Sequence, residues 1–217
     1  MAPGRGRPPQ PGIAQARRAQ ITEAAYAIFA AQGYEDTTIE EIARAAGLGH
    51  GTVYRYFNAK AEILHSVFDY SIERLMTAIE LEPLCAPAES LDDLLDRVQR
   101  MCKDLPEFLT REPELVKLIM VESTAADDEL LLRLRGLADL MVSTLARALA
   151  DGQAAGWVRA SIDPQVYAHT LMSLSVPGLV HVLHERQTRP AELTRFLAVG
   201  AALARSALEV RPAEKQL

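Results

Sequence analysis

Residues 47–57 read GLGHGTVYRYF and place hydrogen-bond donors, aromatic rings and glycines within eleven positions. The Thr52 hydroxyl can donate to a phosphate or reach a base edge, and the Arg55 guanidinium can form paired hydrogen bonds with guanine or phosphate. Tyr54 offers a ring for a thymine methyl group and a hydroxyl for a phosphate. This combination of side chains favours contact with nucleic acid.

Glycine at Gly49 and Gly51 fits the same chemistry. Each glycine costs about 1 kcal/mol relative to alanine in a helix interior, so a buried helix would avoid them. A helix that enters the major groove approaches DNA with its N-terminal end, where small residues let the backbone come near the phosphates. We therefore expect a turn at 47–49 and then a helix about two turns long, which Val53 and Phe57 hold on the core.

The segment before this turn contains the element that positions it. The run Thr38-Ile39-Glu40-Glu41 fits a capping box, in which the Thr hydroxyl and a Glu carboxylate satisfy each other's free backbone amides. Ile42 and Ala46 give the helix that starts there an apolar face, and Gly47 ends it. Apolar spacing predicts an earlier helix over about 17–32. Two short helices joined by a glycine turn form the helix-turn-helix pattern.

The residues TTIEEIARAAGLGHGTVYRYFNAKAEIL closely resemble the DNA-binding segment of the tetracycline-repressor (TetR) family of bacterial transcriptional regulators, and the resemblance extends over residues 17–68. It implies an all-α fold. It also implies an N-terminal three-helix domain that contains the helix-turn-helix, and a C-terminal helical bundle that forms a ligand pocket and a dimer interface. The expected domains are a disordered basic arm at 1–16, a DNA-binding domain at 17–58 and an effector-binding and dimerisation domain at 59–217.

Lys60 lies in the first turn of the next predicted helix. A cation there opposes the helix dipole and costs about 0.3–1 kcal/mol, whereas a phosphate would meet the ammonium and the free amides together. The resemblance implies that this lysine contacts the DNA backbone; a solvated surface lysine is the alternative. Tyr56 also has two interpretations, because its ring can pack beneath the helix or its hydroxyl can reach the DNA backbone. The residues of this segment expected to contact DNA are Thr38, His50, Gly51, Thr52, Tyr54, Arg55, Tyr56 and Lys60.

Charge is unevenly distributed along the chain. Residues 1–60 hold seven Lys or Arg against five Asp or Glu, whereas the remainder holds sixteen against twenty-four, within a net charge of −6. A basic head on an acidic body suggests that only the head meets a polyanion. Arg5 and Arg7 lie in an Arg-Gly-Arg-Pro segment that resembles the AT-hook, an arm that lays arginines along a narrow minor groove. The alternative is a disordered tail that adds only non-specific affinity to the DNA contacts.

The acidic remainder is predicted to be a helical bundle. The resemblance implies that its last two helices pair with their copies in a four-helix dimer interface. The predicted helices span approximately 60–81, 91–105, 113–123, 128–150, 164–184 and 191–209, with breaks at Pro83, Pro87, Pro106, Pro113, Gly152 and Pro190. The apolar residues of the last two helices are Leu171, Leu174, Leu179, Leu183, Phe196, Val199, Leu203 and Leu208.

Large apolar side chains in this bundle are candidates for an effector pocket, although a helical core alone explains most of them. His181 and His184 share a helix face, with Glu185 nearby and His169 on the same helix. This spacing is unspecific for a metal, so we expect neither a metal nor a cofactor. The effector-pocket candidates are Phe68, Met101, Phe108, Met120, Trp157, Tyr167 and Met172.

Composition limits the remaining classes of protein. The sequence has no run of about 18 uncharged apolar residues, and no apolar core follows its basic N-terminus, so we expect a cytoplasmic protein with no membrane partner. Cys85 and Cys102 lack metal-like spacing and fit a reducing compartment. The sequence contains no recognisable polar catalytic cluster, so we do not expect an enzyme.

These observations predict a ligand-responsive DNA-binding transcriptional regulator, a repressor that a small-molecule effector releases from its operator. Its expected partners are a palindromic double-stranded DNA operator, an effector of unidentified chemistry and a second copy of the chain. The resemblance implies that the ligand shifts the helix at 59–82, which joins both domains, and changes the separation of the two recognition helices. The alternative is an architectural or effector-independent DNA-binding protein.

Overall fold

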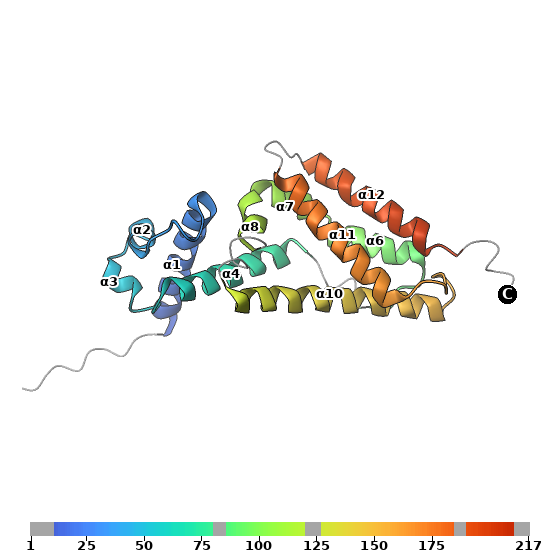
Figure 1. Cartoon of the computed structure of the whole chain (residues 1–217), viewed down its shortest axis with the longest axis horizontal. Helices are drawn as coiled ribbons and strands as arrows, with labels where there is room; N and C mark the ends of the chain where they lie inside the picture. The colour runs from blue at the N-terminus through green and yellow to red at the C-terminus, as the bar shows by residue number, and fades with distance from the viewer. Residues whose placement is uncertain (1–10, 80–85, 120–126, 185–189, 211–217) are drawn as a thin grey trace, which may run out of the picture. The chain divides into compact units, whose positions relative to one another are not determined.

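The structure, a computed structural model, describes residues 11–79, 86–119, 127–184 and 190–210 (Figure 1). Throughout these residues the regular secondary structure is helical, so the predicted all-α class is confirmed. The described residues form two compact units. The first lies within Met1–Ile72 and Lys117–Leu130, and the second within Glu73–Val116 and Leu131–Leu217.

Helices α4 (Lys60–Thr77) and α10 (Asp128–Ala154) contribute residues to both units. As far as Ile72, α4 packs with the N-terminal helices, which is beyond residue 58, the predicted end of the DNA-binding domain. Because that boundary concerns function rather than packing, it stays a prediction.

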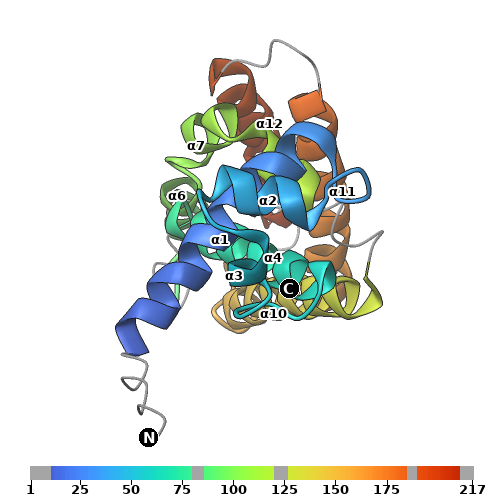
Figure 2. The ribbon, with the colours of Figure 1, turned by 90° about the vertical axis from the view of Figure 1, so that its left-hand side faces the viewer.

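The first unit contains α1 (Pro11–Gln32), α2 (Ile39–Ala45), α3 (His50–Val53) and the first part of α4 (Figure 2). Helix α2 contacts both α1 and α3. Helix α1 begins at Pro11, earlier than the predicted start at residue 17. A proline suits this position, because its φ is already helical and the amide that it lacks would have no partner within the helix.

Helix α3 is shorter than predicted. Its α-helical part is the four residues His50–Val53, a single turn. The backbone nevertheless continues to turn, because the amides of Tyr56 and Phe57 both donate to the Val53 carbonyl, at 2.9 and 3.0 Å. The predicted second turn is therefore present as a tighter, irregular extension that ends at Phe57.

The core of the first unit is built from one face of each helix. Phe29 of α1, Ile42 of α2 and Val53 of α3 are each completely buried. Burying such side chains stabilises the unit by about 1.5–3 kcal/mol for each one. The other fully or almost fully buried residues of these helices include Ile21, Ala25, Phe57, Ile63, Leu64 and Val67.

The second unit contains the C-terminal helices, most of which lie close to their predicted positions. One helix was missed. Pro106 was interpreted as a break, but it lies in the first turn of α7, where the missing amide of a proline costs nothing. The helices that complete the chain are α6 (Leu91–Met101), α7 (Leu105–Arg111), α8 (Pro113–Lys117), α11 (Pro164–His184) and α12 (Pro190–Leu208).

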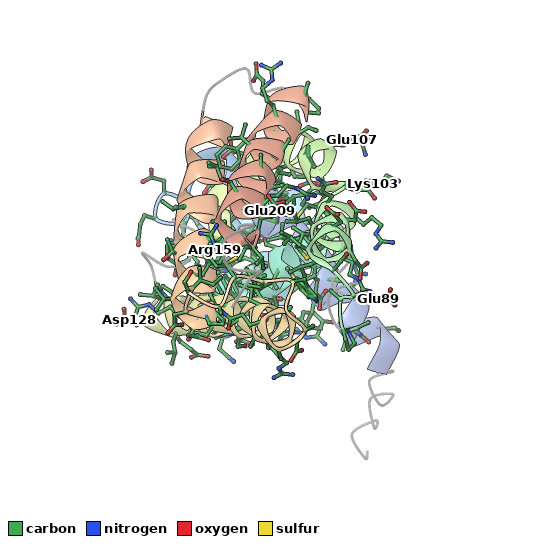
Figure 3. The ribbon with its side chains drawn as sticks, turned by 90° about the vertical axis from the view of Figure 1, so that its right-hand side faces the viewer. Glu89, Lys103, Glu107, Asp128, Arg159 and Glu209 are labelled. Carbon is green, nitrogen blue, oxygen red and sulfur yellow. The ribbon has the colours of Figure 1, made fainter. Side chains whose placement is uncertain are left out.

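Helix α12 packs against three other helices of the second unit, α6, α7 and α11. Its end is fixed by Arg159, whose backbone amide donates to the Leu208 carbonyl and whose guanidinium donates to the Glu209 carbonyl, both at 3.0 Å (Figure 3). Residues of α12 share a hydrophobic cluster with other parts of the second unit, and its buried members are Leu91, Leu94, Leu95, Leu149, Val158, Ala204 and Leu208.

Candidate nucleic-acid interface

Helix α2 starts with the predicted capping box. The Thr38 hydroxyl accepts a hydrogen bond from the Glu41 amide at 3.3 Å, and the Glu41 carboxylate accepts one from the Thr38 amide at 2.8 Å. The hydrogen bond from the Thr38 amide, and then a second one that the Thr38 hydroxyl donates to the same carboxylate, hold the pKa of Glu41 below its ordinary value. Thr38 is exposed, and its hydroxyl serves the cap in the free protein; its contact with DNA stays a prediction.

The turn between α2 and α3 needs glycine at only one of its positions. Gly47 has a φ of +65°, in the left-handed region that favours glycine. Gly49 has a φ of −74° and Gly51 is the second residue of α3, and a Cβ at Gly51 would meet no atom within 4 Å. The fold of the free protein therefore does not explain Gly51, which is exposed beside the outward face of α3.

The two faces of α3 and its extension differ sharply in exposure. Val53 and Phe57 are 0% and 1% exposed, so they hold the segment on the core as predicted. Tyr54 is 47% exposed, and Arg55 beside it is also exposed. Thr52 and Tyr56 are half-buried, so both remain within reach of a partner molecule. A phenol, a guanidinium and a hydroxyl are thus available on one short segment.

His50 is fixed by two neighbours at the start of α3. Its Nε2 lies 3.0 Å from a carboxylate oxygen of Glu40, on α2. Its ring meets that of Tyr54 edge to face, with the ring centroids 4.8 Å apart. Glu40 was missed as a member of the site, since it belongs to another helix and no periodicity relates it to His50.

Arg18 joins α1 to α4 and to the end of the α3 segment, by which we mean α3 and its extension, residues 50–57. Its guanidinium donates to the Tyr56 carbonyl, lies 3.2 Å from a Glu62 oxygen and stacks on the Phe57 ring at 4.1 Å. The pKa of Glu62 is lowered, first by the hydrogen bond from the Asn58 amide and then by Arg18. Arg18 is not among the residues predicted for the site, yet its guanidinium orients the segment.

Lys60 is placed differently from the other predicted DNA contacts. Its Nζ donates to three backbone carbonyl oxygens in the loop between α1 and α2, at 2.8–3.1 Å. A phosphate contact by Lys60 stays a prediction. Arg5 and Arg7, predicted to enter the minor groove, lie outside the described residues.

The effector-pocket candidates are distributed over both units. Phe68 is buried in the first unit. Trp157 and Tyr167 pack against the cluster around Leu149 in the second unit, and Met172 packs against a separate cluster. Met101 is buried and Phe108 half-buried, whereas Met120 lies outside the described residues. That these side chains line a ligand cavity stays a prediction.

Apolar side chains are exposed on both C-terminal helices. Leu174 on α11 is 69% exposed, and Val199 and Leu203 on α12 are 54% and 66% exposed. Leu208 belongs to the core instead, at 2%, because it packs in the cluster around Leu149. Leu171 and Phe196 are half-buried, and the side chains of Leu179 and Leu183 lie outside the described residues.

The described residues contain neither a metal-binding cluster nor a membrane-spanning helix. No three His, Cys, Asp or Glu side chains gather there in a way that could hold a metal ion; His169 is exposed, and the side chains of His181 and His184 lie outside that part of the chain. None of the helices in the described ranges combines the length and the apolar character needed to cross a membrane.

Two family models match the chain. The model of the bacterial regulatory proteins of the tetR family matches residues 21–67, which contain α2, α3 and the start of α4. The model of the tetracyclin repressor-like C-terminal domain matches residues 95–186. The first model covers most of the predicted DNA-binding part and continues past residue 58 into the next part, and the second lies within the predicted effector-binding part.

Curated relatives share part of this match. The HTH-type transcriptional regulator SrpR of Pseudomonas putida is 46% identical over 54 residues, which cover 25% of this chain and 25% of SrpR. The HTH-type transcriptional repressor KstR of Mycolicibacterium smegmatis is 28% identical over 139 residues, or 63% of this chain and 65% of KstR. The chain thus spans less than two thirds of the length of these relatives.

Solved structures share the fold over nearly the whole chain. A TetR transcriptional regulator from Chloroflexus aurantiacus has a TM-score of 0.67 at 21% identity, covering 92% of this chain and 100% of its own. GusR of Salmonella enterica has a TM-score of 0.62 at 22% identity, covering 94% and 99%. With its helix-turn-helix, its two family models and this fold, the chain belongs to the TetR family of bacterial transcriptional regulators.

Proposed function

We propose that this chain is a ligand-responsive transcriptional repressor, which binds a palindromic DNA operator as a homodimer and is released by a small-molecule effector. Its family consists of transcriptional regulators rather than enzymes. The observation that carries the proposal is the division of the α3 segment into a buried face and an exposed one. Val53 and Phe57 anchor it, and Tyr54 and Arg55 are left outward.

The exposed groups suit both kinds of DNA contact. Arg55 can pair with the acceptors of guanine, and the Tyr54 ring can contact a thymine methyl group. The hydroxyls of Thr38 and Thr52 suit phosphates, which position the protein without reading sequence. His50 and Gly51 lie at the N-terminal end of α3, the end that a recognition helix presents to the major groove. Tyr56, Arg5 and Arg7 complete the proposed contact set; Lys60 is not part of it, because its ammonium donates to carbonyl groups of the loop between α1 and α2.

The homodimer is supported by the exposed apolar residues of α11 and α12. Leu174, Val199 and Leu203 are exposed in a single chain, and a second copy would cover them. A two-fold axis through this interface would repeat the α3 segment, so the operator would consist of two symmetric half-sites.

The effector is proposed to bind in the second unit. The indole N–H of Trp157 is buried and has no hydrogen-bond partner among the described residues. A buried donor of this kind calls for an acceptor, which an ordered water or a polar group of the effector would supply. Helices α4 and α10, which contribute to both units, are the available connections to the DNA-binding helices.

The DNA part of the proposal is tested by selecting random DNA fragments with the purified protein and sequencing them. We expect an enriched pseudo-palindrome. Tyr54→Ala should weaken binding to that fragment while the unfolding temperature and the sedimentation of the dimer stay unchanged. The absence of any enriched sequence, or full affinity in Tyr54→Ala, would refute the proposed interface.

The effector part is tested with the intrinsic fluorescence of Trp157, the only tryptophan of the chain. Compounds that change this fluorescence in a library screen should also lower the affinity for the selected DNA fragment. If compounds bind near Trp157 and none changes DNA affinity, the protein is an effector-independent DNA-binding protein.

A further inference from the structure

The Lys60 ammonium is enclosed by the loop between α1 and α2. Its Nζ donates to the carbonyl oxygens of Tyr34 at 2.8 Å, Glu35 at 3.1 Å and Thr37 at 3.0 Å. An ammonium has three N–H donors, so there is one carbonyl for each of them. The same nitrogen lies 4.3 Å from the centroid of the Tyr34 ring, a cation–π distance.

This loop determines where α2 begins. It starts at Gly33, whose φ of +87° favours glycine. The Thr37 side chain is 2% exposed, and its hydroxyl donates to the Gly33 carbonyl at 2.7 Å. The next residue, Thr38, is the N-cap of α2, and α2 in turn contacts α3. A group that fixes the loop therefore also fixes the helix-turn-helix.

The position of Lys60 on α4 fits this use. As the first residue of α4, it has its charge at the positive end of the helix dipole, which is unfavourable. Hydrogen bonds from a charged donor to carbonyl oxygens are stronger than those between neutral groups and offset this cost. The unusual position of the lysine thus has a cause within the free protein, without any phosphate.

We propose that Lys60 is a positioning residue, whose ammonium holds the loop between α1 and α2 so that Thr38 caps α2 in the place required for DNA binding. A Lys60 that contacted a phosphate would exchange at least one loop carbonyl for a phosphate oxygen. The link to DNA rests on the proposed function, whereas the fixed loop is a property of the free protein.

The test compares four charge-removing substitutions. Lys60→Met keeps the aliphatic stem and removes the donors, and Lys60→Gln is a milder variant with fewer donors. Arg55→Met removes a proposed DNA contact, and Arg147→Met removes an exposed charge from α10 as a matched control. Hydrogen exchange of the Glu41 and Ile42 amides, which bond to Thr38, is measured without DNA. The salt dependence of binding is measured with the DNA fragment selected by the wild-type protein.

If Lys60 positions the loop, the two amides exchange about tenfold faster or more in Lys60→Met, with an intermediate rate in Lys60→Gln and wild-type rates in both arginine variants. DNA affinity then falls in Lys60→Met while the slope of log K against log salt matches that of Arg147→Met. Arg55→Met should instead lower that slope by about 0.9.

Two results would overturn the inference. One is wild-type exchange of the Glu41 and Ile42 amides in Lys60→Met. The other is a salt slope lowered in Lys60→Met by about 0.9, as loss of a phosphate contact requires. A wild-type protein that selects no DNA would instead refute the proposed function, and the exchange rates would still decide the role of Lys60.

Discussion

Replacing Gly51 by alanine separates what the fold requires at this position from what DNA contact requires. Gly51 has no positive φ, and an added Cβ would have no atom within 4 Å. The free protein should therefore accept alanine without strain. If the backbone of α3 approaches DNA closely at this point, the same methyl group would lie between the helix and the duplex.

The expected effects of Gly51→Ala on stability and on DNA affinity have opposite signs. Because Gly51 lies within α3, alanine should raise the free energy of unfolding by about 0.4–1 kcal/mol. Inserting a methyl group into a packed contact costs about 1–3 kcal/mol, so DNA affinity should fall about 5- to 140-fold. Gly136→Ala, at an exposed position on α10 with the same open surroundings, is the control and should stabilise the protein without changing DNA affinity.

Urea unfolding and fluorescence anisotropy with the selected DNA fragment measure the two quantities. Full DNA affinity in Gly51→Ala would show that the DNA does not approach α3 at this residue. A lower free energy of unfolding in Gly51→Ala would show that the fold itself requires the glycine. Either result would refute the reasoning.

Two further outcomes follow from the structure, and a third follows from the sequence of the N-terminal arm. Gly152→Ala should lower stability by about 1–3 kcal/mol in urea unfolding, because its Cβ would lie 2.5 Å from the Trp157 ring; wild-type stability would contradict this packing. Glu62 and Asp127 have lowered pKa values in the folded state. The stability that they provide is therefore complete above the ordinary carboxyl range near pH 4–4.5 and is lost as the pH falls through the lowered values. The free energy of unfolding of Glu62→Gln, measured between pH 6 and 3, should depend less on pH than that of the wild-type protein, and an unchanged pH profile would contradict this. Deleting residues 1–12 should weaken binding more on operators with A·T-rich flanks than with G·C-rich flanks, measured at two salt concentrations; equal losses would mean a non-specific tail.

The parts of the interface that follow from local rules were predictable. The capping box at Thr38 needs only residues three apart, and Gly47 ends α2 through its own backbone conformation. The burial of Val53 and Phe57 follows from the helical period. Each of these features depends on a few consecutive residues, so a short stretch of sequence contains all the information.

The parts that depend on tertiary contacts were not predictable. Lys60 meets carbonyl groups more than twenty residues earlier, and Arg18 reaches Tyr56 and Glu62 across three helices. No periodicity connects such positions. The prediction that Pro106 breaks the helical structure was wrong for another reason. A proline can end one helix or begin the next, and the choice depends on packing.

The effector pocket is the least accessible to sequence reasoning. Its candidates were large apolar residues, and Trp157, Tyr167 and Met172 pack against core clusters as such residues do in any helical bundle. Apolar character alone does not separate a core from a binding cavity. The screen with Trp157 fluorescence instead tests directly whether a compound binds near these side chains.

The location of the DNA on the protein tests the central claim most directly. Hydrogen exchange measured by mass spectrometry, with and without the selected DNA fragment, reports which backbone segments the DNA protects. We predict slower exchange in peptides that cover residues 38–57 when DNA is bound. Unchanged exchange across 38–57, with protection confined to the second unit, would contradict the account.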